Sequence, residues 1–217
     1  MAERIQTINE EIANTVTHGL GILFSLIAIP VLIICARQNS TPNIVWAVSV
    51  FGFGMLMVYM SSTLYHAVRT HNTKRLLRIW DHISIFLLIA GTYTPMIVKF
   101  TNTSTAIIFL SIMWAIVVIG SVMKIFFTGK YKIVSVLLYV ALGWMAVFVI
   151  RPLAANMPAQ VFWWLFAGGM AYMFGVIFYL WKKLQYHHAV WHVFVLTGTV
   201  AHFFAVYNSI PVLVHLQ

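Results

Sequence analysis

Residues 43–68 read NIVWAVSVFGFGMLMVYMSSTLYHAV, an apolar run long enough to cross a bilayer as one helix. The run contains no charged residue, and it ends in the polar group Ser61-Ser62-Thr-Leu-Tyr-His66. The next apolar run opens with Trp80-Asp81-His82. Asp81 is the only carboxylate of the chain after residue 11, and a carboxylate inside a membrane span usually has a function.

The composition extends this reading to the whole chain. Of the 217 residues, 62% are hydrophobic and 8% are charged, and the mean hydropathy is +0.92. Apolar runs of spanning length lie at about 16–36, 43–68, 79–99, 104–123, 132–150, 160–181 and 188–213. Because these runs are continuously apolar rather than alternating, we expect helices and not barrel strands. The sequence predicts an all-α membrane protein, a seven-transmembrane helix bundle that forms a single domain over residues 1–217.

The positions of Lys and Arg predict the orientation of this bundle. Of the 13 basic residues, all but Arg37, Lys99 and Arg151 lie in the N-terminal segment or in the second, fourth and sixth loops. By the positive-inside rule, the N-terminus, with a short segment over residues 1–15, is cytoplasmic and the C-terminus is outside. The formal net charge of +9 is spread in small groups between apolar runs, which argues against nucleic-acid binding. We expect a multi-pass protein of the plasma membrane whose partners are lipids, and the oligomeric state stays open.

Four polar side chains share one predicted depth in the bundle. His66 ends the second span, Asp81 opens the third, and His188 and His192 open the seventh, so all four lie at the predicted cytoplasmic end. His188 and His192 are four residues apart and therefore lie on one face of a helix, close enough to share a metal ion. Ser62 and His66 have the same spacing.

Three imidazoles with a carboxylate or a water form a common tetrahedral zinc site, and an open fourth position is typical of catalytic zinc. Imidazole also suits iron, nickel and copper, so zinc is a preference among several metals. A metal in this position would lower the pKa of a bound water to about 7 and would polarise a carbonyl group. Asp81 would be the fourth ligand, or would orient or deprotonate that water.

The alternative is that these residues only bond to one another, because histidines at helix ends often form hydrogen bonds across a bundle. The matching depth and the single membrane carboxylate favour a metal site. His71 and His187, beside the predicted loops, are expected to be solvated. His202 lies ten residues beyond His192, about 15 Å deeper on a helix, and is expected to face the bundle interior without reaching the metal.

A second polar group stands at the entrance to the first span. Glu11, Asn14 and His18 follow a three- and four-residue spacing, which places them on one helix face at the cytoplasmic end. Two roles stay open for them: a network at the start of the helix, or the lining of the approach to the metal.

Three motifs of the chain resemble the haemolysin III branch of the progestin and adipoQ receptor family over nearly its whole length. They are Glu11-Ile-Ala-Asn14-Thr-Val-Thr-His18-Gly19; Ser61-Ser62-Thr-Leu-Tyr65-His66 with Trp80-Asp81-His82-Ile-Ser and Gly91-Thr-Tyr93-Thr-Pro95; and His188-Ala-Val-Trp191-His192 with His202. The resemblance implies a seven-helix bundle with its N-terminus inside. It also implies a Zn²⁺ ion near the inner face, held by His66, His188 and His192, with Asp81 engaged through water, Ser62 near the zinc, and Tyr65 beside the site.

The family resemblance leaves three functions open. A site layout similar to that of the alkaline ceramidases implies zinc-dependent hydrolysis of a lipid amide or ester, with Asp81 as base and Ser62 as oxyanion or supporting donor. The haemolysin name implies instead a cytolytic pore. The third reading is a non-catalytic membrane-homeostasis or receptor-like protein with a structural metal. The short N-terminal segment is similar to the bacterial branch rather than to the animal receptors.

Overall fold

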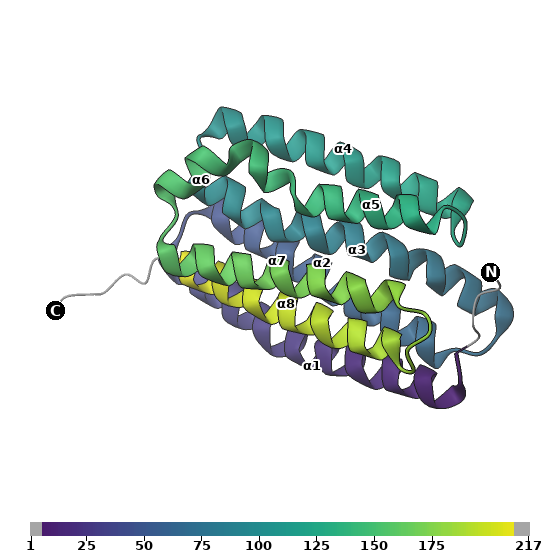
Figure 1. Ribbon diagram of the computed structural model, residues 1–217. Helices are drawn as coiled ribbons and strands as arrows, with labels where there is room; N and C mark the ends of the chain where they lie inside the picture. Colours follow the sequence, from purple (N-terminus) through teal and green to yellow (C-terminus); the bar gives the residue numbers. More distant parts are fainter. Residues whose placement is uncertain (1–5, 211–217) are drawn as a thin grey trace.

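The computed structural model describes residues 6–210, apart from the side chain of Lys132, and every regular element in that range is a helix (Figure 1). The elements are α1 (Ile8–Asn39), α2 (Pro42–Ala67), α3 (His71–Phe100), α4 (Thr103–Phe127), α5 (Lys132–Gly143), the 3₁₀ helix η1 (Met145–Val149), α6 (Ile150–Asn156), α7 (Ala159–Leu180) and α8 (His187–Ser209). By length and composition, seven segments within these residues are able to cross a membrane, the fifth being Ile133–Asn156. The predicted all-α, seven-span architecture is confirmed, and the orientation of the termini stays a prediction.

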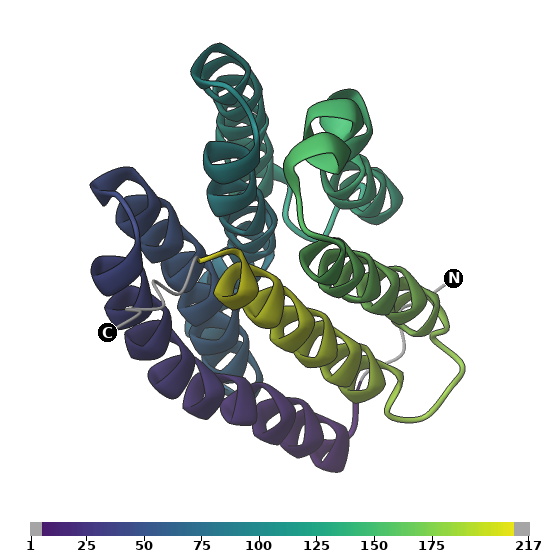
Figure 2. The ribbon, with the colours of Figure 1, turned by 90° about the vertical axis from the view of Figure 1, so that its left-hand side faces the viewer.

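The helices form one bundle in which α1 packs between α2 and α8 (Figure 2). α3 packs against both α2 and α4, and α7 packs against α8. Successive spans run in opposite directions, so the start of α1 lies at the same end as the α2–α3, α4–α5 and α7–α8 connections (Figure 1). We call this the basic end, because most Lys and Arg residues of the chain occur in or beside these segments.

The first helix begins about two turns before the apolar run that starts near residue 16. A capping box holds this start: Thr7 Oγ1 accepts a hydrogen bond from the Glu10 backbone N–H, and the Glu10 carboxylate accepts one from the Thr7 N–H. The extra turns bring Glu11 and Asn14 into α1. The helix extends beyond the apolar run because hydropathy marks only the part that crosses the membrane, whereas the cap sets where the helix begins.

The fifth span was predicted as one run over residues 132–150, and the structure interrupts it. α5 ends at Gly143, and η1 and α6 carry the chain on to Asn156. Tyr93 of α3 covers the break, because its hydroxyl donates to the Gly143 carbonyl and accepts from the Ala146 N–H at 2.9 Å. A side chain of a neighbouring helix thus satisfies backbone groups that a broken membrane helix leaves open.

Close packing of α2 on α3 fixes the depth at which their polar ends meet. A Cβ atom on Gly54 would lie 2.6 Å from the Leu87 carbonyl oxygen, so only glycine allows this approach. Phe51 and Phe86 are fully buried in the same core, while large side chains such as Ile27 and Phe126 are exposed on the outer surface. An apolar exterior of this kind is what a bilayer requires.

Candidate metal centre

The structure brings three histidines together at the basic end. His66 comes from the last turn of α2, and His188 and His192 come from the first turns of α8. One ligand nitrogen from each lies within 4.8 Å of the other two. The ring centroids of His66 and His192 are 5.1 Å apart, and those of His188 and His192 are 4.5 Å apart. These three side chains form a possible metal site, which combines residues that are more than 120 positions apart in the sequence.

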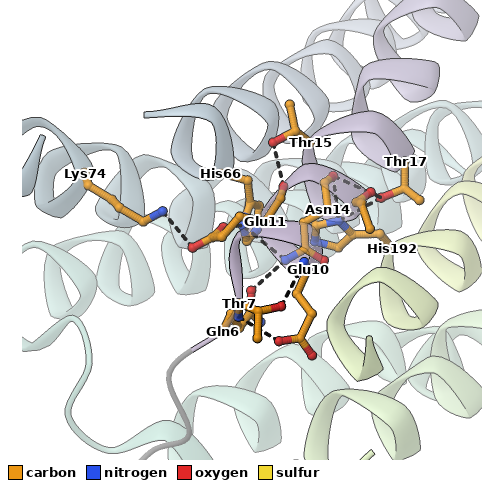
Figure 3. A network of polar contacts seen from close by, with 11 residues as sticks. Gln6, Thr7, Glu10, Glu11, Asn14, Thr15, Thr17, His66, Lys74 and His192 are labelled. Carbon is orange, nitrogen blue, oxygen red and sulfur yellow. Dashed lines mark hydrogen bonds and ion pairs between the residues drawn. The ribbon is translucent and has the colours of Figure 1, made fainter. Parts of the chain in front are cut away.

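A carboxylate of α1 orients the His66 ring. His66 Nδ1 donates a hydrogen bond to Glu11 Oε2 at 2.6 Å, and Lys74 Nζ donates to Glu11 Oε1 at 2.8 Å (Figure 3). Because Nδ1 carries the proton, Nε2 of the neutral ring keeps its lone pair. His66 Nε2 is buried and has no hydrogen-bond partner among the described residues. A carboxylate behind a histidine in this way is the usual support of a metal ligand.

The backbone of α1 orients the second ring. His192 is almost fully buried, and its Nδ1 lies 3.2 Å from the Asn14 carbonyl oxygen and 3.3 Å from Thr17 Oγ1 (Figure 3). The carbonyl accepts only, so Nδ1 of His192 is the donor and Nε2 is again left for a ligand. Helix α1 therefore presents hydrogen-bond acceptors to both α2 and α8.

Two further polar side chains close to the cluster are buried without partners. His18 stacks on His192 with ring centroids 3.5 Å apart, and its edge contacts Tyr59. Within residues 6–210, neither nitrogen of His18 has a hydrogen-bond partner. The same is true of Ser62 Oγ. Buried polar atoms are normally satisfied, so these atoms are open to a polar group from outside the chain.

Asp81 stands apart from the histidine cluster. Its side chain is 14% exposed, and Oδ2 lies 3.4 Å from His82 Nδ1. Asp81 is not among the side chains whose ligand atoms converge, although it interacts electrostatically with His66 and His192. Tyr65, in contrast, lies beside the cluster: its ring centroid is 4.7 Å from that of His66. Lys74 Nζ lies 5.0 Å from the Tyr65 ring centroid.

The remaining histidines divide into two cases. His202 is buried deep in the bundle, where its Nε2 lies 3.3 Å from the Leu165 carbonyl and its ring lies against Tyr172. It faces the interior, as its spacing from His192 predicts. His187 was expected to be solvated, and that prediction is wrong: it is 6% exposed and packs beside His188. The reason is that α8 begins at His187, which turns this residue toward the bundle.

Comparison with known proteins agrees with this architecture. The family model described as "Haemolysin-III related" matches residues 6–203 of the chain. The protein belongs to this family. The resemblance to the haemolysin III branch of the progestin and adipoQ receptor family is therefore confirmed.

The relatives of this haemolysin-III protein cover almost its whole length. It is 42% identical to the "Hemolysin-3 homolog" of Bacillus subtilis over 200 residues, which is 92% of this chain and 94% of the relative. It is 40% identical to "Hemolysin-3" of Bacillus cereus over 206 residues, 95% and 94% of the two chains. A more distant relative is the human "Monocyte to macrophage differentiation factor". It is 24% identical over 208 residues, which is 93% of this chain and 85% of the relative. Membership of this family and the seven apolar segments of the described chain together indicate a multi-pass membrane protein. A location in a bacterial plasma membrane is consistent with both.

Sequence reasoning about this haemolysin-III protein missed the contacts around Glu11. The spacing of Glu11, Asn14 and His18 predicts a shared helix face, but it does not tell which helix that face meets. The structure shows that it meets α2 through His66 and α8 through His192. Lys74 also had no predicted role, and no local pattern could have paired it with Glu11, 63 residues earlier.

Proposed function

We propose that this protein is a zinc-dependent hydrolase that cleaves an amide or ester bond of a membrane lipid. The observation that carries the proposal is the convergence of His66, His188 and His192 within 4.8 Å, with Nδ1 of two rings already bonded to acceptors on α1. Three converging imidazoles suit Zn²⁺, and the buried, unpartnered Nε2 of His66 fits a metal ligand.

Each polar residue of the site takes one role in this proposal. His66, His188 and His192 would hold the zinc ion, which supplies a Lewis acid and an activated water at neutral pH. Asp81, near the cluster but outside it, would accept a proton from the attacking water. The hydroxyl of Ser62 would donate a hydrogen bond to the oxygen of the lipid carbonyl as negative charge develops there.

The arrangement of polar residues favours this reading over a pore, despite the name of the Bacillus relatives. Buried polar side chains such as Asn14, His18 and Ser62 gather at the basic end. Deeper in the bundle, the buried hydroxyls of Thr94 and Ser209 donate to carbonyls of their own helices, and His202 contacts the Leu165 carbonyl. A pore needs a continuous polar path, and hydroxyls closed onto their own backbone do not provide one.

The first experiment is to measure metal content by elemental mass spectrometry on detergent-purified protein. We expect one zinc per chain in the wild type and none in His192→Ala, whereas His202→Ala, which removes a buried histidine outside the cluster, should keep its zinc. Equal zinc in His192→Ala and wild type would contradict the ligand set. Lipid amides and esters are then screened for turnover by the zinc-loaded protein. Bound zinc without turnover of any of them would favour a non-catalytic, receptor-like or homeostatic role.

A further inference from the structure

Away from the histidines, positive charge gathers where α3 meets the connection between α4 and α5. Lys124 lies in the last turn of α4, and Lys130 is exposed in the loop that follows. The Arg78 guanidinium of α3 approaches this loop at Gly129, where a Cβ atom would lie 3.5 Å from Nη1. Gly129 has a φ of +85°, and its missing side chain leaves room for the guanidinium. We call Arg78, Lys124 and Lys130 the cationic junction.

The charge of this junction is poorly compensated within the described chain. Lys124 is 5% exposed, and its ammonium donates to Ser135 Oγ and lies 5.6 Å from the Tyr139 ring centroid. Among the described residues, the carboxylates form ion pairs with His66, Lys74 and His82, and none with Lys124 or Arg78. Asp81 attracts the Lys124 ammonium from further away, while Arg78 repels it. A buried cation of this kind favours an anion from outside the chain.

The start of α5 adds to the positive potential. Ser135, which receives the Lys124 ammonium, lies in the first turn of this helix. The residue before the helix, Tyr131, provides no side-chain cap, so the first amide groups of α5 are left without a side-chain acceptor. The positive end of the helix dipole therefore faces the same place as the three cations, which is the arrangement that binds phosphate groups.

The surroundings of the junction match a lipid better than a soluble anion. Phe126 and Ile133, on either side of it, are 72% and 71% exposed, so they offer apolar surface to acyl chains. The cavity bounded by Lys124, Lys130 and Ser135 has a volume of only about 10 Å³. This space admits a single oxygen-sized group, so a phosphate would lie at its mouth with one oxygen directed toward Lys124.

We propose that the cationic junction binds the phosphate group of an anionic phospholipid. Arg78 provides a planar pair of donors for two phosphate oxygens, and Lys124 and Lys130 act as compact charges on either side. The acyl chains lie along the apolar surface that Phe126 and Ile133 expose. The site is independent of the proposed hydrolase, since it uses none of the residues assigned to zinc or to lipid cleavage.

The test is native mass spectrometry of protein released from nanodiscs of equal parts phosphatidylcholine and phosphatidylglycerol. The variant is R78Q/K130Q, which removes two cations at the surface of the junction and leaves buried Lys124 in place. The control is R75Q/K183Q, which removes two exposed cations at the same end of the bundle. We expect phosphatidylglycerol to remain on the wild type and the control, and its retention to fall about fivefold for each junction cation removed.

Two results would overturn the proposal. Equal retention of phosphatidylglycerol by R78Q/K130Q and R75Q/K183Q would show that the lipid responds to total charge and not to this junction. Displacement of phosphatidylglycerol from the wild type by low millimolar inorganic phosphate would show that a soluble anion is the ligand. A monodisperse profile in size-exclusion chromatography is required of both variants, and K124M, which keeps the aliphatic stem, repeats the test at the buried position.

Discussion

At the scale of single residues, Glu11 links the start of α1 to the candidate metal centre. Its two carboxylate oxygens accept hydrogen bonds from His66 Nδ1 and Lys74 Nζ, so one side chain fixes both the tautomer and the direction of the His66 ring. Sequence spacing alone left the role of Glu11 open between a helix-start network and the surroundings of the metal. In the structure, Glu10 serves the start of the helix and Glu11 serves the histidine.

Replacing Glu11 by Gln should weaken zinc binding about 10- to 100-fold, because an amide holds the imidazole less firmly than a carboxylate. The measurement is the apparent Kd for zinc from competition with a chelator. Glu10→Gln is the matched control: it changes the neighbouring carboxylate, which caps α1 and accepts from the Tyr186 N–H, and should leave the Kd unchanged. Similar Kd values for Glu11→Gln and wild type would exclude a supporting role for this carboxylate.

Replacing Asp81 tests proton transfer separately from metal binding. Because Asp81 lies outside the histidine cluster, Asp81→Asn should keep most of the zinc while lipid hydrolysis falls below detection. Zinc content and turnover of the same preparation are measured together. Turnover at the wild-type rate in Asp81→Asn would remove this residue from the mechanism, whereas loss of zinc would make it a ligand.

At the scale of helices, the contact between α2 and α3 determines whether His66 and Asp81 reach the same depth. Gly54→Ala would place a methyl group against the Leu87 carbonyl, and we expect a loss of about 1–3 kcal/mol in the free energy of unfolding. Gly19→Ala is the control, because no atom lies within 4 Å of a Cβ at that position of α1. That variant should be neutral or more stable by up to about 1 kcal/mol, since alanine favours a helix. Unfolding in detergent measures both, and equal stability of the two variants would contradict the close approach.

At the scale of the whole molecule, the candidate metal centre joins helices from opposite ends of the chain. His66 lies on α2, His188 and His192 lie on α8, and their supporting acceptors lie on α1. A metal held there would stabilise only the folded bundle. Removing zinc with a chelator should therefore lower the Tm of the wild type. If free zinc was present at 100 times its Kd, the free energy of unfolding should fall by about 2.7 kcal/mol. His66→Ala should begin at the lower Tm and not respond to the chelator, and a chelator effect of the same size in this variant would place the metal elsewhere.

The sequence by itself determined the number of spans and the helical class, because hydropathy and helical spacing are local properties that a bilayer enforces along each segment. Its motifs, rather than its hydropathy, identified the family. The sequence also predicted His66, His188 and His192 as candidate ligands, since polar residues are rare in a membrane, and these three side chains do converge in the structure. The tertiary structure alone decided that Glu11 meets His66, that His18 stacks on His192, and that Asp81 stays outside the cluster. These contacts depend on where a capping box begins α1 and on how closely glycine lets α2 approach α3. Such packing joins residues far apart in the chain, and no local pattern encodes it.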